Sequence, residues 1–300
     1  MNEKEESKAS IISVLNMKGG VGKTTLTCNL AIELAQKGYS VLVVDIDPQF
    51  NSTQTLIKYF TGNLELYSEI SDNDFTIKNI FYNFGTPSVI SQKDTDPISG
   101  QNHKIPNIFS LTKDGISLDL IAGDLHLIVD INASSRDKFG AFFNNNDLRS
   151  QYNYILIDCP PTWGELTSVA LSTSNYYLIP TTLDDFSTIG ISILKDQLMT
   201  KIQALTPNTL HCLGVAYTFL TPTTAQDGIA RRQKPIKHDV EKFFSKMSQD
   251  LKTDVEPFKT IFYRDNSFVG TSAIYKSNKK KPEFAAKATE FTEEVIDRTN

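Results

Sequence analysis

The chain has 300 residues and a formal net charge of −5, with 40% hydrophobic and 22% charged residues. That length allows one large domain or two small ones, and the composition is ordinary for a soluble globular protein with a buried core. The net negative charge argues against a surface coated in positive charge, although a local basic patch can still hold nucleic acid.

The cysteines and the N-terminal residues indicate in which cellular compartment the protein is found. Cys28, Cys159 and Cys212 lie far apart and form no CxxC pair, which argues against a disulfide framework and the usual zinc or iron–sulfur spacings. Residues 1–10 (MNEKEESKAS) are polar and charged, so we expect a disordered tail and no signal peptide. No run approaches the ~20 apolar residues of a membrane span. We therefore expect a cytoplasmic protein.

A strand, a glycine-rich turn, a helix and a second strand follow the tail. Residues 11–15 (IISVL) form a short β-branched run that predicts a buried strand. From Thr24 the apolar spacing becomes helical, and Gly38 is a good C-terminal stop for that helix. Residues 41–44 (VLVV) predict the second buried strand. This βαβ order implies a parallel sheet with a right-handed crossover.

The segment from about Thr61 to Gly115 interrupts this alternation of strands and helices. It is rich in Asn, Ser, Asp, Thr and Pro, and its apolar residues keep no steady period. A long structureless loop inside a compact domain is uncommon. We therefore interpret residues 61–115 as a functional or mobile insertion, which could dock a partner, extend an interface or do neither.

Strands and helices alternate again after the insertion. The predicted strands are residues 118–121, 154–157, 177–179, 213–217 and, with a weaker pattern, 259–262. The predicted helices are residues 189–205, 239–251 and 284–298. The sequence therefore predicts a single α/β domain over residues 11–300, in which helices flank a doubly wound, mostly parallel sheet.

The glycine-rich turn after the first predicted strand reads MKGGVGKTT. Gly19, Gly20 and Gly22 allow a tight turn in which several backbone N–H groups point at one anion. The helix that follows adds the attraction of its N-terminal dipole and unpaired N–H groups. The turn therefore predicts a phosphate-binding loop.

The residues that follow the glycines indicate a nucleoside triphosphate. Lys23 can reach the β and γ phosphates, and the Thr24 hydroxyl is placed to ligate Mg²⁺. The strict P-loop pattern has glycine where Met17 stands.

Three motifs resemble those of the ParA/MinD family of deviant Walker ATPases. They are KGGVGKTT at residues 18–25, VVDIDPQ at residues 43–49 and LIDCPP at residues 156–161. Members of that family commonly lack the leading glycine, which accounts for Met17. The resemblance also covers SLDLIAGDLHL and YYLIPTTLDDFSTIG. It implies an ATP- and Mg²⁺-dependent P-loop ATPase, closest to the ParA/Soj partition type.

The resemblance implies a role for each matching residue. Lys18 matches the signature lysine, which reaches across a nucleotide-sandwiched dimer to the partner's phosphates, and Thr25 would contact the α phosphate. Asp47 matches the aspartate that positions the attacking water, whereas Asp45 and Asp158 match carboxylates that hold Mg²⁺ through its water shell. The implied nucleotide-binding set is Lys18, Gly19, Gly20, Val21, Gly22, Lys23, Thr24 and Thr25; the catalytic set is Lys18, Lys23 and Asp47; the metal set is Thr24, Asp45 and Asp158.

The adenine-binding residues are less defined. The family usually recognises adenine with Asn or Asp after a late strand, which makes Thr218 and residues 263–266 candidates. A plain turn at Asp265 and Asn266 is the alternative, and the sequence leaves the two open.

The resemblance implies a function in plasmid or chromosome partitioning. In that family a slow ATPase binds nucleoid DNA as an ATP homodimer, without sequence preference, and a ParB-like centromere-binding adaptor stimulates hydrolysis and release. Such binding needs basic side chains aimed at phosphates. The candidates are Arg231, Arg232, Lys234 and Lys237, and then Lys276, Lys279, Lys280 and Lys281. A solvated charged face remains the alternative for either group.

Two other positioning roles can be weighed. The same DNA-bound dimer could position a protein cargo, and the sequence does not separate this role from partitioning. Membrane positioning of the MinD kind needs a basic amphipathic C-terminal helix, whereas the chain ends in the acidic ATEFTEEVIDRTN. We therefore expect a cytoplasmic, nucleoid-associated protein that does not bind membranes.

Overall fold

The computed structural model describes residues 9–82, 105–128, 131, 133–204, 209–268 and 274–300. Within them one mixed sheet has eight strands in the order β3-β4-β2-β5-β1-β6-β7-β8. The strands are β1 Ser10–Val14, β2 Val41–Asp45, β3 Phe109–Lys113, β4 Ile116–Ile121, β5 Tyr154–Asp158, β6 Tyr176–Thr181, β7 His211–Leu220 and β8 Pro257–Tyr263. Neighbouring strands are parallel except β3 and β4, which are antiparallel. The predicted doubly wound α/β fold is confirmed.

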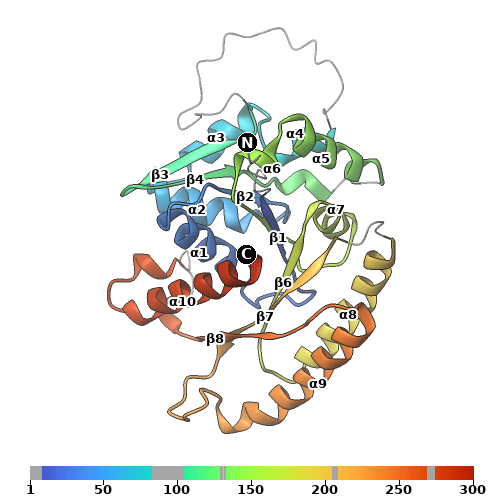
Figure 1. Cartoon of the computed structure of the whole chain (residues 1–300). Helices are drawn as coiled ribbons and strands as arrows, with labels where there is room; N and C mark the ends of the chain where they lie inside the picture. The colour runs from blue at the N-terminus through green and yellow to red at the C-terminus, as the bar shows by residue number, and fades with distance from the viewer. Residues whose placement is uncertain (1–8, 83–104, 129–130, 132, 205–208, 269–273) are drawn as a thin grey trace, which may run out of the picture.

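Helices cover both faces of the sheet (Figure 1). They are α1 Lys23–Gln36, α2 Asn51–Thr61, α3 Glu65–Asp72, α4 Ile77–Tyr82, α5 Ala133–Asn145, α6 Leu148–Gln151, α7 Glu165–Thr173, α8 Ser187–Ala204, α9 Lys234–Leu251 and α10 Pro282–Thr299. One face carries α1, α2, α3 and α10, and the other carries α4 to α9. Figure 1 shows α1 beside α10 and α8 beside α9.

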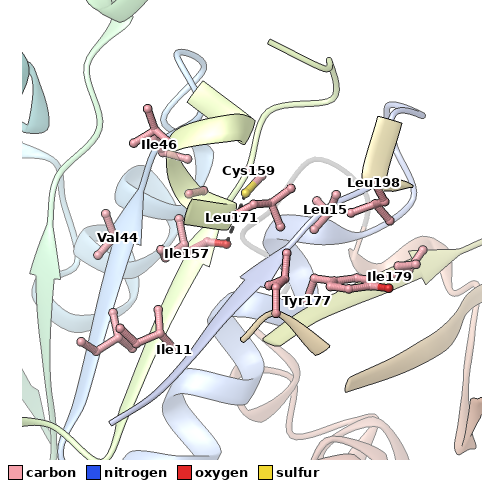
Figure 2. Packing of buried hydrophobic residues seen from close by; sticks show 14 of the residues in the cluster. Ile11, Leu15, Val44, Ile46, Ile157, Cys159, Leu171, Tyr177, Ile179 and Leu198 are labelled. Carbon is pink, nitrogen blue, oxygen red and sulfur yellow. Dashed lines mark hydrogen bonds between the residues drawn. The ribbon is translucent and has the colours of Figure 1, made fainter. Parts of the chain in front are cut away.

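The strands supply alternate side chains to the two apolar layers, because successive residues of a strand point to opposite faces. In β5, Ile155 and Ile157 join the layer under α7 and α8, whereas Leu156 joins the layer under α1. Figure 2 shows the first layer, in which Ile11, Ile157 and Tyr177 from three neighbouring strands lie together. Strands buried on both faces explain the continuous apolar runs in the sequence.

Helices α9 and α10 begin earlier than the sequence pattern predicts. Helix α9 starts at Lys234, five residues before the predicted start at 239, and α10 starts at Pro282. Proline occupies the first turn of both helices, where its missing N–H costs no hydrogen bond and its fixed φ suits the helix. The proline therefore marks a helix start in each case.

The predicted tail and insertion need correction where the structure describes them. Strand β1 begins at Ser10, and the neighbouring Ala9 is buried, so these two residues belong to the packed domain. Residues 61–115 contain α3, α4 and β3, so a large part of the predicted structureless segment is ordered. Residues 1–8 and 83–104 lie outside the described residues.

The strand order places three chain segments at one point of the sheet edge. Parallel β5 lies between β1 and β2, and Asp158 pairs in register with both Val14 and Asp45. The chain leaves β1 toward α1 on one face, whereas α7 follows β5 on the other. Ligands of open α/β sheets bind at such a point, outside the carboxyl ends of the strands.

Candidate nucleotide-binding site

The glycine loop after β1 is shaped for a bound anion. Gly20 has φ of 71° and Gly22 has φ of 87°, which is the left-handed region that glycine adopts at no steric cost. A Cβ on Gly22 would also lie 3.1 Å from the ring of Phe219, whereas one on Gly19 would meet no atom within 4 Å. The loop is thus tight on its inner side and open toward a cavity of about 320 Å³.

Lys23 is a buried cation inside this loop. Its Nζ donates to the backbone carbonyls of Asn16 and Lys18, each at 3.2 Å, and its side chain lines the cavity. Burial lowers the pKa of Lys23, and the charges of Asp158 and Asp47 oppose that shift. Among the described residues its hydrogen-bond partners are these two carbonyls, and a buried ammonium group held in this way is well suited to receive a phosphate.

Asp158, at the end of β5, accepts hydrogen bonds from described residues through one oxygen only. Its Oδ2 accepts the hydroxyls of Thr24 at 2.7 Å and Ser52 at 2.5 Å. Its Oδ1 is buried and has no hydrogen-bond partner within the residues that the structure describes. An unsatisfied buried carboxylate oxygen is costly and needs an explanation. A cation or its water shell would satisfy it.

The donors around Asp158 suit Mg²⁺ that is held mainly by a nucleotide. Among the described residues, no group of three or more His, Cys, Asp or Glu side chains forms a metal site without help. Mg²⁺ usually keeps several waters and binds through one or two protein oxygens together with phosphates. The Thr24 hydroxyl and the Asp158 carboxylate fit that pattern, so the residues present fit the ion.

Asp45, at the end of β2, accepts hydrogen bonds from neighbouring residues through both of its carboxylate oxygens. Its Oδ2 accepts the N–H and the hydroxyl of Thr53, both at 2.8 Å, and its Oδ1 accepts the Asp47 N–H at 3.3 Å. Burial raises the pKa of Asp45 well above its ordinary value, and the charge of Asp158 adds to that shift. Asp45 therefore fixes α2 beside the site, and any contact with the ion would be in addition to this role.

Asp47 lies between two cavities. Its side chain lines both the cavity over the glycine loop and a neighbouring one of about 400 Å³. Its Oδ1 accepts the Gln49 N–H at 3.0 Å, which fixes the carboxylate at the border. A carboxylate in this position can hold a water against a phosphate in the loop.

Lys18 is folded onto its own chain. Its Nζ donates to Asp184 and, at 3.2 Å, to the hydroxyl of Thr182. Burial would raise the pKa of Asp184, but hydrogen bonds from Lys18, Thr182 and the Phe186 N–H lower it below its ordinary value. If the Nζ of Lys18 turns toward another chain, this ion pair is broken.

A larger cavity of about 860 Å³ lies beside the glycine loop. Its lining includes Phe219, which also lines the loop cavity, together with Arg264, Asp265 and Asn266. Such a volume is in the usual range for small-molecule pockets, so it can receive the base and ribose of a nucleotide. Three of the four candidate residues 263–266 are thus at the cavity wall.

Thr218 does not line either cavity. Its hydroxyl is buried and lies 2.7 Å from the carbonyl of Val21 and 3.1 Å from that of Thr181. These bonds tie the glycine loop to the end of β6. The candidate Thr218 therefore acts as a brace of the loop in this structure.

The first predicted basic group lies at the start of α9. Lys234 Nζ pairs with Asp227 at 2.7 Å. Lys237 Nζ pairs with Glu241 at 2.5 Å. Arg232 is exposed and lines the 860 Å³ cavity. The group is Arg231, Arg232, Lys234 and Lys237, and half of it is neutralised by carboxylates.

The second predicted basic group precedes α10. Lys276 pairs with the buried Glu33 of α1 at 2.7 Å, so it belongs to the packing of the domain. Lys281 pairs with Asp265 at 3.0 Å, at the rim of the 860 Å³ cavity. Between them, Lys279 and Lys280 are exposed, and the described part of the chain shows no ion pair for either. These two lysines are the best placed of the group to meet a phosphate backbone.

Several residues of the site are absent from the motif assignments. Ser52 and Thr53 come from the first turn of α2, and Asn16 precedes the loop and donates to the Pro180 carbonyl at 2.7 Å. Thr182 and Asp184 follow β6. The NST triplet at residues 51–53 was the available signal, because its hydroxyls are hydrogen-bond donors close in sequence to the predicted strand-end carboxylates of DIDPQ.

Because its pKa is raised, Asp158 should make the difference in stability between the wild type and Asp158→Asn depend on pH. Burial raises this pKa to about 6, against hydrogen bonds from Ser52 and Thr24, whereas an unfolded aspartate titrates near about 3.9. Between these values the unfolded state loses its proton first, so ionisation of Asp158 destabilises the nucleotide-free protein as pH rises. Relative to the wild type, Asp158→Asn should gain on the order of 2 kcal/mol in unfolding free energy from about pH 4 to about pH 6. Urea titrations across this range check it, and parallel pH profiles for the two proteins would contradict it.

Sequence comparison identifies a family for most of the chain. The family described as AAA domain matches residues 9–212. An uncharacterised protein of Methanocaldococcus jannaschii is 34% identical over 187 residues, 62% of this chain and 64% of that protein. The sporulation initiation inhibitor protein Soj of Bacillus subtilis is 30% identical over 61% of this chain and 62% of its own length. The chromosome partitioning protein ParA of Myxococcus xanthus is 29% identical over 79% of this chain and 72% of its own. The chain thus spans less than two thirds of the first two relatives.

Solved structures share the fold. The structure of pNOB8 ParA matches with a TM-score of 0.69 at 22% identity, over 97% of this chain and 98% of its own. The same ParA bound to nonspecific DNA matches with a TM-score of 0.65 at 23% identity, over the same shares. Cobyrinic acid a,c-diamide synthase from Mycobacterium smegmatis, with a bound ATP analogue and magnesium, has a TM-score of 0.56 at 20% identity, over 78% of this chain and 82% of its own. Among the helices that the structure describes, none has the length and apolar character to cross a bilayer.

Proposed function

Because this chain belongs to the AAA-domain family, and within it to the ParA/MinD type of P-loop ATPases, we propose that it is an ATP-driven DNA-partitioning switch. In this proposal it binds ATP with Mg²⁺, dimerises, holds DNA without sequence preference and hydrolyses ATP slowly. A ParB-like centromere-binding adaptor stimulates that hydrolysis and releases the DNA. The cargo is a plasmid or a chromosome.

One observation carries the proposal: the functional groups of three separate motifs meet at one edge of the sheet. Lys23 and Thr24 come from the loop after β1, Asp47 follows β2, and Asp158 ends β5. The unsatisfied Oδ1 of Asp158 and the open face of the glycine loop are the features of a site that is complete only with a charged ligand. The neighbour with a bound ATP analogue and magnesium supports ATP and Mg²⁺ as that ligand.

Each residue has a task that follows from its position. Lys23 and the loop N–H groups bind the phosphates, and Thr24 and Asp158 hold the ion. Bound Mg²⁺ supplies neutralisation of the charge on the β and γ phosphates. Asp47 holds the attacking water, because it lies at the border of the loop cavity and is fixed by the Gln49 N–H.

The switch between monomer and dimer follows from Lys18. In the single chain this lysine is paired with Asp184. In the proposed dimer it turns to the phosphates of the second copy, which offer more negative charge than one carboxylate. The ion pair with Asp184 is thereby exchanged for a contact between subunits, and hydrolysis reverses the exchange.

Binding to nonspecific duplex DNA tests the function directly. Affinity should be measured over a range of salt concentrations for the nucleotide-free, ADP and ATP states of the full chain. We expect binding in the ATP state only, with a steep fall as salt rises, because phosphate contacts release counterions. If the three nucleotide states bound DNA equally, or if none bound it, the proposal that ATP switches DNA binding would be wrong.

Two exposed lysines should contribute to this binding. Replacing Lys279 and Lys280 by glutamine should weaken binding to all sequences alike and flatten the salt dependence by about 0.9 in log–log slope for each phosphate that the variant no longer neutralises. The matched control replaces Lys58 and Lys259, which are also exposed but lie outside both basic groups. If both double variants weaken DNA binding to the same extent, the loss reflects the change in net charge. Lys279 and Lys280 then belong to a solvated loop that does not contact DNA.

A further inference from the structure

Helix α8 exposes an apolar stripe beside the loop that carries Lys18. Phe186, Ile189 and Ile193 are 69%, 58% and 44% exposed. Phe186 directly precedes the helix, and Ile189 and Ile193, four residues apart, lie on one face of it. Among the described residues only Leu64 and Leu125 are comparably exposed large apolar side chains. The stripe is therefore a concentrated patch, and exposed apolar patches mark interaction sites.

The same helix already buries its opposite face. Ile191, Leu194 and Leu198 are fully buried in the layer between the sheet and α9. Packing of the domain thus accounts for one side of α8 and leaves the stripe without a function inside the monomer. At its two ends the stripe gives way to the exposed Asp185 and Asp196, so an apolar centre has a polar rim, as in protein interfaces.

The stripe lies on the part of α8 that contacts Lys18. A Cβ at Gly190 would be 4.0 Å from the Cβ of Lys18, so this turn of the helix packs against the lysine. The N–H of Phe186 donates at 3.1 Å to Asp184, the carboxylate that holds Lys18. The loop that carries Lys18 and the start of the stripe are therefore neighbours, and a second chain that Lys18 reaches can also meet Phe186 and Ile189.

We infer that this stripe is part of the contact between two copies of the chain in their ATP-bound state. The inference rests on the proposed function, which has Lys18 cross to a second copy. In a two-fold dimer the same patch faces its counterpart, so two apolar stripes would be removed from water together. The chain's own second copy is thus the occupant that the position of Lys18 favours.

The size of the stripe explains why the contact depends on ATP. A fully buried aromatic side chain covers about 150–250 Å², so three partly exposed apolar side chains supply less than the ~800 Å² per partner of a stable interface. The stripe is too small to hold two copies together alone. It adds to a dimer whose remaining contacts are the bound nucleotides and the released Lys18.

The test compares dimerisation with nucleotide binding in the full chain. Ile189→Asp and Phe186→Ser should each weaken ATP-dependent dimerisation at least tenfold, measured by sedimentation or light scattering. ATP affinity at concentrations where the protein is monomeric should not change. Ile189→Val, which keeps an apolar side chain, should dimerise as the wild type does. Leu64→Asp is the matched control, because it puts the same charge on an exposed apolar site away from α8.

Each outcome has a separate meaning. If Ile189→Asp and Phe186→Ser dimerise like the wild type, the stripe is not part of the interface and the inference is overturned, whereas the proposed ATP switch stands. The inference is overturned equally if they dimerise normally and lose only the response to another protein, which would make the stripe a surface for that protein. If the wild type itself stays monomeric with ATP, the dimer in the proposed function fails and takes the inference with it.

Discussion

Replacing Lys23 by alanine is expected to lower the affinity for ATP at least about 100-fold, which corresponds to about 2.7 kcal/mol. In the structure the ammonium group is buried inside the glycine loop and bonded to two backbone carbonyls. Charge-assisted hydrogen bonds in such an environment contribute about 1.5–3 kcal/mol each, and the lysine can make two of them to phosphate oxygens. Alanine removes this cation together with its bonds to the two loop carbonyls. Calorimetric titration with a nonhydrolysable ATP analogue measures the effect.

Lys37→Ala is the control for this prediction. It removes the same charge from the residue that follows the last turn of α1, where Lys37 pairs with Glu293 at 2.9 Å on the surface. Exposed ion pairs contribute little to stability, so we expect unchanged ATP affinity. Circular dichroism of both variants shows whether they are folded. Unchanged affinity in folded Lys23→Ala protein would refute the assignment of residues 18–25 as a P-loop.

The strands and the loop could be predicted because their signals are local. Residues buried on both sides give continuous apolar runs, and Gly20 and Gly22 need the left-handed backbone that the structure has. The meeting of Asp45 with Asp158 is not local, since the two residues lie on strands that are far apart in the chain. It could still be anticipated, because carboxylates that end neighbouring parallel strands lie at the same sheet edge.

The sequence contains a signal for the β3–β4 hairpin that the sequence analysis did not use, namely the dipeptide Asp114-Gly115. Asp114 and Gly115 both have positive φ, of 51° and 78°, as a tight hairpin turn requires, and Asp-Gly is a typical sequence for it. The polar composition of residues 61–115 concealed this pair and the short helices α3 and α4. Composition averages over a segment, whereas one dipeptide determines a turn.

The partners of the charged residues could not be read from the sequence. Lys276 and Lys279 belong to the same basic run, yet Lys276 is paired with the buried Glu33 and Lys279 is exposed. Likewise, Lys18 is paired with Asp184, and 166 residues separate them. A charge pattern predicts how many cations are available, and only the fold decides which of them already have a partner.

Replacing Asp47 by alanine is expected to slow ATP hydrolysis by about 100- to 1,000-fold, because positioned acid–base groups typically contribute about 10²–10⁴. ATP affinity should change little, since the proposed phosphate contacts come from the glycine loop and Lys23 and not from this carboxylate. The side chain borders the loop cavity and is fixed by the Gln49 N–H at 3.0 Å, so it can accept a hydrogen bond from a water in that cavity. The variant should therefore accumulate as an ATP-bound dimer. Single-turnover hydrolysis and equilibrium binding, measured on the same preparation, separate the two effects.

Asp47→Asn and Asp239→Ala complete this experiment. The asparagine keeps an acceptor for the Gln49 N–H and loses the negative charge, so it should be as slow as alanine if the charge orients the water. Asp239→Ala removes an exposed carboxylate from α9 and should leave hydrolysis unchanged. If Asp47→Ala turned over at the wild-type rate, the water would have to be held elsewhere at the same border. Since Gln49 lines both cavities as Asp47 does, it would then be the residue to replace.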